Sequence, residues 1–188
     1  MNLFKYIAIA AFSITMIACG EASTSKKQDG IKDSLAKDNR PEELKALTRK
    51  ILAAPGNAVL YDQRANYYIK HQQQELAFED LKMAFSLDSL NPAFYISLSK
   101  YYIEQKEPAN VRLALEDGLR KNPDNTELNL QLGEFFMIAR KHDISFKYIN
   151  KALKKDKYNA RGYFLKGMNY KFLFKEKEAI SRFQTAIE

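Results

Sequence analysis

The chain repeats itself at a fixed interval, and this period limits its possible folds more than any other feature. Asparagine recurs with a 34-residue period at Asn57, Asn91, Asn125 and Asn159. Two further columns keep the same phase, small residues at Ala65, Ser99, Gly133 and Gly167 and aromatic residues at Tyr68, Tyr102, Phe136 and Tyr170. Such a recurrence, without insertions, indicates one structural unit used four times in succession.

Each column has a physical role in a pair of packed helices. Asparagine is a good helix N-cap, because its side-chain oxygen accepts a hydrogen bond from an unpaired backbone N–H of the first turn. Small residues let two helices approach closely, and large apolar residues at helical spacing fill the space between them. Polar breaks such as "KHQQQ" and "ARKHD" divide the units, so we expect a helix–turn–helix in each.

These residues resemble the tetratricopeptide repeat. The family's fourth-position aromatic is matched by Tyr61, Tyr95 and Tyr163, its seventh-position leucine by Leu98 and Leu132, and its twentieth-position alanine by Ala77 and Ala179. The resemblance implies an all-α fold, a right-handed superhelix of helix–turn–helix repeats over residues 57–188. The four units are expected at 57–90, 91–124, 125–158 and 159–188.

Some positions depart from the family pattern. Asn129 stands where the third unit should have its aromatic residue, and Arg64 and Lys166 stand in place of the leucine. We expect looser packing at these contacts, without loss of the repeat's phase.

Two segments lie directly before the repeats. Residues 41–56 predict one helix that caps the first unit, since the terminal repeats of such arrays need a cover. Residues 19–40 are polar, of mixed charge and without an aromatic residue, which predicts a flexible tether.

Residues 1–18 are typical of an export signal. Lys5 is followed by an apolar run over residues 6–17, which is too short to span a bilayer comfortably. The run ends in Met16-Ile17-Ala18-Cys19, which resembles the lipobox of bacterial lipoproteins. The resemblance implies a signal peptide over 1–18, acylation of Cys19 and attachment to a membrane of the bacterial envelope, the outer one in a two-membrane cell. The alternative is an ordinary secretory signal or membrane anchor with an incidental cysteine.

Positive charge is concentrated in the distal half of the chain. The whole sequence carries a net charge of +7, and residues 126–188 hold 13 Lys and Arg against 7 Asp and Glu, whereas residues 19–125 hold 16 of each sign. We interpret most of this charge as lysines on solvated helix faces, and we expect no nucleic-acid partner. If the protein is exported, the expected charged partner of a basic surface is an anionic envelope polymer or a lipid headgroup.

The sequence shows no catalytic constellation, so we expect neither an enzyme nor a bound cofactor or metal. A metal site needs three or four convergent ligands. The two histidines, His71 and His142, fall in the predicted turns of different units, and we expect both to be solvated.

In the tetratricopeptide family the first helix of each unit lines a concave groove. The resemblance implies nine partner-binding residues there, Ile96, Lys100, Ile103, Leu130, Glu134, Met137, Phe164, Met168 and Phe172. We expect the distal apolar members to form an exposed patch of the kind that marks interaction sites. The alternative is that part of this stripe packs internally.

The sequence therefore predicts a lipid-anchored scaffold of the cell envelope. Its groove would bind envelope proteins or peptides and help to assemble or position a complex. The competing class is a lipoprotein that takes up glycan or peptide fragments, because a fold alone does not fix a function.

Overall fold

The computed structural model describes residues 40–188, and every regular element in that part of the chain is an α-helix. The predicted signal peptide, Cys19 and most of the predicted tether lie outside the described residues. The helices are α2 (Glu42–Ala53), α3 (Ala58–Lys70), α4 (Gln74–Leu87), α5 (Pro92–Glu104), α6 (Pro108–Lys121), α7 (Thr126–Ile138), α8 (His142–Lys155), α9 (Ala160–Phe172) and α10 (Glu176–Ile187).

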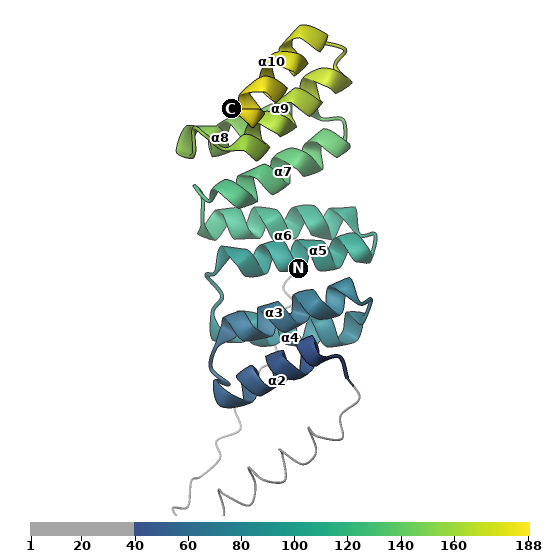
Figure 1. Cartoon of the computed structure of the whole chain (residues 1–188), viewed down its shortest axis with the longest axis vertical. Helices are drawn as coiled ribbons and strands as arrows, with labels where there is room; N and C mark the ends of the chain where they lie inside the picture. Colours follow the sequence, from purple (N-terminus) through teal and green to yellow (C-terminus); the bar gives the residue numbers. More distant parts are fainter. Residues whose placement is uncertain (1–39) are drawn as a thin grey trace, which may run out of the picture. The chain divides into compact units, whose positions relative to one another are not determined.

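From residue 41 onward the helices pack as hairpins that follow one another in chain order (Figure 1). The tightest pairs are α3 with α4, α5 with α6, α7 with α8 and α9 with α10, one pair for each unit of the sequence repeat. The predicted all-α helix–turn–helix array is confirmed. Helix α2 lies within the range 41–56 and packs on α3, where its Leu44 and Ile51 are buried.

The repeated asparagines start the first helix of every unit, as predicted. The side-chain oxygens of Asn57 and Asn91 accept from the backbone N–H two residues later, and those of Asn125 and Asn159 from the N–H three residues later. Each bond satisfies one of the backbone donors that a helix start leaves unpaired. A local side-chain bond therefore fixes where each repeat begins.

Small residues allow the paired helices to approach closely. At Gly133 a Cβ atom would lie 2.5 Å from Cγ1 of Ile149, closer than packed carbon atoms approach. The α7–α8 contact therefore requires glycine at this position. Gly162 has the same role for α9, because a Cβ there would lie 2.7 Å from Cδ2 of Leu153 on α8.

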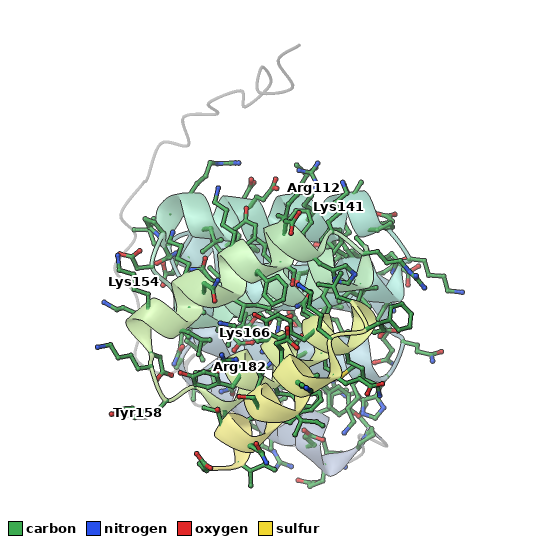
Figure 2. The ribbon with its side chains drawn as sticks, turned by 90° about the horizontal axis from the view of Figure 1, so that it is seen from above. Arg112, Lys141, Lys154, Tyr158, Lys166 and Arg182 are labelled. Carbon is green, nitrogen blue, oxygen red and sulfur yellow. The ribbon has the colours of Figure 1, made fainter. Side chains whose placement is uncertain are left out.

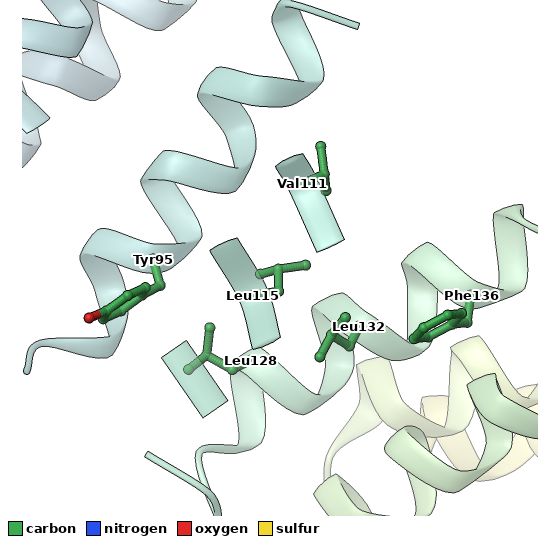
Figure 3. Close-up of a cluster of buried hydrophobic side chains, with 6 residues drawn as sticks. All are labelled: Tyr95, Val111, Leu115, Leu128, Leu132 and Phe136. Atoms are coloured by element: carbon green, nitrogen blue, oxygen red, sulfur yellow. The ribbon is translucent and has the colours of Figure 1, made fainter. Parts of the chain in front are cut away.

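A buried apolar cluster connects the second repeat to the third (Figure 3). Tyr95 comes from α5, Val111 and Leu115 from α6, and Leu128, Leu132 and Phe136 from α7. Burial of such side chains is the main favourable term in folding, so this cluster holds the two repeats together.

Asn129 preserves a hydrogen bond that the aromatic residue makes elsewhere. The hydroxyls of Tyr61 and Tyr95 donate to the carbonyl six residues earlier, and Asn129 Nδ2 donates to the equivalent carbonyl, that of Pro123, at 3.3 Å. The substitution keeps this polar contact but loses the ring, and the buried Oδ1 of Asn129 has no hydrogen-bond partner among the described residues.

The replacement of the seventh-position leucine has opposite results in the first and last repeats. In the first, Arg64 forms two hydrogen bonds of 2.6 and 2.8 Å to the buried carboxylate of Asp80. In the last, the same two positions hold Lys166 and Arg182, which lie close together in Figure 2. Burial and the charge of Arg182 lower the pKa of Lys166. The buried Nε of Arg182 has no hydrogen-bond partner among the described residues.

This like-charge pair makes a stability prediction. Arg182→Asp should raise the free energy of unfolding by about 1 kcal/mol, since it replaces a repulsion with the ion pair of the first repeat. The gain over the wild type should shrink as the pH rises through the lowered pKa of Lys166, because the wild-type amine becomes neutral there and no longer repels Arg182. Urea unfolding of both proteins at several pH values measures this. An equal gain in Arg182→Gln would show that relief of repulsion alone accounts for it.

Candidate partner-binding groove

The first helices of the four repeats, α3, α5, α7 and α9, are neighbours in sequence order and carry the predicted groove residues. Three hollows lie along them. One is polar and lies over α2, α3 and α5, one is apolar and lies between α5 and α7, and one lies between α9 and α10.

The polar hollow holds two of the predicted residues, Ile96 and Lys100. It has a volume of about 680 Å³. A hydrogen-bond network lies across it, in which Asn66 Nδ2 donates to Ser97 Oγ at 2.7 Å and to Asp62 Oδ2 at 3.3 Å. Lys100 Nζ is 3.5 Å from Asn66 Oδ1. These bonds connect α3 to α5 across the boundary between the first two repeats.

Asp62 is the buried acid of this hollow. Burial raises the pKa of Asp62, and the Ser97 hydroxyl and the Lys100 charge oppose that rise. The raised pKa means that ionised Asp62 is less favourable in the folded chain than in water. The stability contribution of Asp62 therefore falls as the pH rises above the ordinary value of an aspartate.

The apolar hollow, here called the inter-repeat cleft, is a space of about 560 Å³ between the second and third repeats. Ile103, Phe135 and Ile138 line its mouth, and Val111 and Leu115 of the buried cluster form its floor. Predicted residue Glu134 also lines it. An apolar hollow with a few polar groups at its edge is the usual form of a binding site.

The burial of one repeated position shows that the inter-repeat cleft is open. Ile69, Ile103 and Met137 stand at the same place in successive repeats. Ile69 and Met137 are each 7% exposed, whereas Ile103 is 54% exposed. The side chain of Ile103 therefore lacks the cover that its counterparts have.

An ion cluster forms the polar wall beside the cleft. Arg161 of α9 pairs with Glu127 and Glu134 of α7, at 2.5 Å to Glu134 Oε2. Burial lowers the pKa of Arg161, but the hydrogen bonds that its guanidinium donates to the two carboxylates outweigh this effect and raise the pKa above its ordinary value. The carboxylate of Glu134, a predicted groove residue, is thus held by the protein itself.

Two of the predicted groove residues are not on the surface. Leu130 is 1% exposed, and Met137 is also buried; both belong to a cluster with Ile149, Ala152, Leu153 and Leu165. The expectation that they form an exposed patch is wrong. Gly162 explains the burial of Leu130. Because this residue has no side chain, α9 can pack directly against Leu130 and Leu153 and cover them.

The other distal residues have different surroundings. Phe164 is half-exposed beside Phe183 of α10 and lines the third hollow, about 540 Å³ in volume. Met168 is partly buried against the Leu130 cluster. Phe172 is half-exposed at the end of α9, next to the ring of His142. The structure therefore does not bring these three together with Leu130 and Met137 into one exposed patch.

The prediction that His142 is a solvated turn residue is wrong. His142 begins α8, and its Nδ1 lies 2.9 Å from Oδ1 of Asn169, which is fully buried. Asn169 Nδ2 donates to Ser145 Oγ at 2.8 Å, and Ser145 donates to the Gly133 carbonyl. This network connects α7, α8 and α9. His71 is exposed at the end of α3 and packs on Tyr67.

Residues 40–188 contain no group of three or more His, Cys, Asp or Glu side chains placed to hold a metal ion. Among the same residues, no helix is both long and apolar enough to cross a bilayer.

Comparisons with solved structures identify the fold. A tetratricopeptide protein of Thermus thermophilus matches with a TM-score of 0.67 at 18% identity, over 77% of this chain and 79% of that one. The chain has the tetratricopeptide repeat fold. PilW, a type IV pilus biogenesis factor, matches with a TM-score of 0.66 at 14% identity, over 90% of this chain and 79% of that one.

A third tetratricopeptide structure, YrrB, is described as having an unusual peptide-binding site. It matches with a TM-score of 0.55 at 15% identity, over 86% of this chain and 79% of that one. No protein-family model and no curated protein matches the sequence. At these identities the comparisons establish the architecture.

Proposed function

We propose that this tetratricopeptide protein is a scaffold that binds a partner protein or peptide through its groove, with an apolar side chain of the partner inserted in the inter-repeat cleft. The observation that carries the proposal is the exposure of Ile103 above the buried floor of Val111 and Leu115. A partner side chain in the cleft would gain the apolar contacts that Ile69 and Met137 gain from their own repeats.

We further propose that the scaffold is a lipoprotein of the bacterial cell envelope, attached through acylated Cys19 and the tether of residues 19–40. The sequence around Cys19 supports this, and the likeness to a pilus biogenesis factor is compatible with a role in assembling an envelope complex. Two or more acyl chains make membrane attachment stable, since each buried methylene contributes about 0.8 kcal/mol.

A second candidate function rests on the polar hollow. Asp62, Asn66 and Ser97 offer hydrogen-bonding groups of the kind that a glycan or a peptide backbone could engage. On this account the protein takes up glycan or peptide fragments. Saturable binding of such fragments, lost in Asn66→Ala but retained in Ile103→Asp, would favour it.

The partner proposal is tested by purification from crosslinked membranes of the native cell. Ile103→Asp should abolish recovery of the partner, because a charge at the mouth of the inter-repeat cleft opposes apolar insertion. Leu113→Asp is the matched control, since Leu113 is a comparably exposed apolar residue of α6 that does not line the cleft. Equal recovery from both variants would reject the cleft as the binding site.

The anchor proposal has a separate test. Cys19→Ser should abolish incorporation of labelled fatty acid and leave the precursor uncleaved, because the thiol is the site of acylation. Normal processing of this variant, followed on gels, would rule out a lipobox.

A further inference from the structure

The turn between α9 and α10 has an unusual residue at a strained position. Each repeat joins its two helices through a residue with positive φ, and these are Gln72, Lys106, Arg140 and Phe174, with φ between 56° and 58°. The first three are polar. In the fourth a bulky aromatic residue occupies a backbone conformation that such residues rarely adopt. The ring is nevertheless 93% exposed, so packing within the protein does not explain it.

The neighbours of Phe174 enlarge this apolar tip. Phe172 and Leu173 directly before it are also exposed. Three consecutive large apolar residues at an exposed turn form a tip with no covering element among the described residues. Exposed apolar patches of this kind mark contact with another protein or with a membrane.

Basic residues surround the tip. Lys171 and Lys175 lie on either side of it in the sequence, and both are exposed. The α7–α8 turn lies beside it, since the ring of His142 at the start of α8 is 6.1 Å from that of Phe172. That neighbouring turn adds exposed Arg140 and Lys141; the basic side chain of Lys141 is labelled in Figure 2.

These residues define what we call the distal edge: Arg140, Lys141, Lys171, Phe172, Leu173, Phe174 and Lys175. The acids closest in sequence, Asp143, Glu176 and Glu178, belong to the first turns of α8 and α10. Counted with these acids and with Lys177, residues 138–143 and 171–178 hold five cations and three acids, so the two turns keep an excess of positive charge.

We propose that the distal edge inserts its apolar tip into a lipid surface that carries anionic headgroups. Apolar side chains enter the boundary between headgroups and acyl chains to a depth of about 5–10 Å, while lysine and arginine beside them pair with the headgroups. An exposed apolar turn flanked by cations fits a lipid surface, whereas a protein partner of similar chemistry would more naturally use a hollow such as the inter-repeat cleft.

This contact goes beyond the proposed acyl anchor and would have a distinct effect. The acyl chains hold the tether, whereas the distal edge would hold the repeat array itself against the surface. It would thereby restrict the orientation in which the groove meets its partner.

The sequence has no tryptophan, which permits a clean test. Phe174→Trp, in the full chain, places a single tryptophan at the tip, and this residue can be excited selectively beside the eleven tyrosines. Lys106→Trp is the matched control, because Lys106 occupies the equivalent position of the second repeat and has nearly the same φ as Phe174. With vesicles of phosphatidylcholine and phosphatidylglycerol, only Phe174→Trp should shift its emission to shorter wavelength and be quenched by brominated lipids.

The origin of the contact is tested by two further comparisons. The shift should be much reduced on vesicles of phosphatidylcholine alone, and also when Lys171→Glu and Lys175→Glu are added to Phe174→Trp. Co-sedimentation with the vesicles, measured in parallel, reports attachment of the chain by any route, whereas the emission of Phe174→Trp reports insertion of the edge alone. The proposal would be overturned if the chain co-sediments with the vesicles but the emission of Phe174→Trp remains that of a tryptophan in water. The partner of the edge would then be a protein.

Discussion

Leu130→Glu is expected to destabilise the third and fourth repeats by about 4 kcal/mol, with loss of helical circular dichroism at modest urea concentrations. Leu130 is almost fully buried among Ile149, Leu153 and Leu165. An ionised carboxylate placed there has no partner and loses its hydration, which is among the largest penalties that a single substitution can introduce. Urea unfolding followed by circular dichroism gives the free energy of unfolding.

Phe164→Glu is the matched control for that experiment. Phe164 lies on the first helix of the next unit, at the place that corresponds to Leu130, but it is half-exposed. The variant should therefore unfold within about 1 kcal/mol of the wild type. If the two variants proved equally stable, Leu130 would be reachable from water and the cluster around it would be wrongly assigned.

The second large effect is expected at the ion pair of the first repeat. Asp80→Ala should destabilise the protein by about 3–5 kcal/mol, because it leaves the guanidinium of Arg64 largely buried without its carboxylate. The rings of Tyr61 and Tyr68, each 5.9 Å from that guanidinium, cannot replace an anion. Chemical unfolding measures the loss.

The second repeat provides the control for this ion pair. At the two equivalent positions it has Leu98 and Ala114, so Arg64→Leu combined with Asp80→Ala copies a pair that the chain already uses. The double variant should recover most of the lost stability, because replacing both charged partners removes the unpaired charge. If the double variant were as unstable as Asp80→Ala, the lost charge pairing would not be the cause.

The sequence could predict those features that depend on local contacts. The four asparagine caps act within three residues of themselves, so their position in the sequence determines where the helices start. The repeat period then determines the number and order of the helix pairs. The hydrogen bond of Asn129 shows that a departure from the pattern need not loosen the structure, because a different side chain can reach the same carbonyl.

The candidate site was harder to predict because it depends on how closely successive repeats pack. Ile103 and Met137 occupy the same position in the repeat, yet only Ile103 is exposed. Repeat position alone places both in the groove. The difference arises from the packing of α9 over Met137 and from the separation of α5 and α7 at the inter-repeat cleft.

Contacts between positions far apart in the sequence were also missed. Asp80 lies 16 residues from Arg64, and Asn169 lies 27 residues from His142. A comparison of equivalent repeat positions could have indicated the first pair, since an arginine in place of leucine needs a counter-charge when it is buried. No comparable signal marks the second pair.

A partner that occupies the inter-repeat cleft should be captured there by photo-crosslinking. The most direct measurement introduces a photo-crosslinking phenylalanine analogue at Ile138, which lies exposed at the mouth of the cleft, and irradiates intact cells. The same analogue at Leu113 on α6 is the control. We predict one dominant crosslinked protein from position 138, absent from position 113 and lost when Ile103→Asp is added. Crosslinks of equal yield from both positions, or from position 113 alone, would show that the partner does not occupy the cleft.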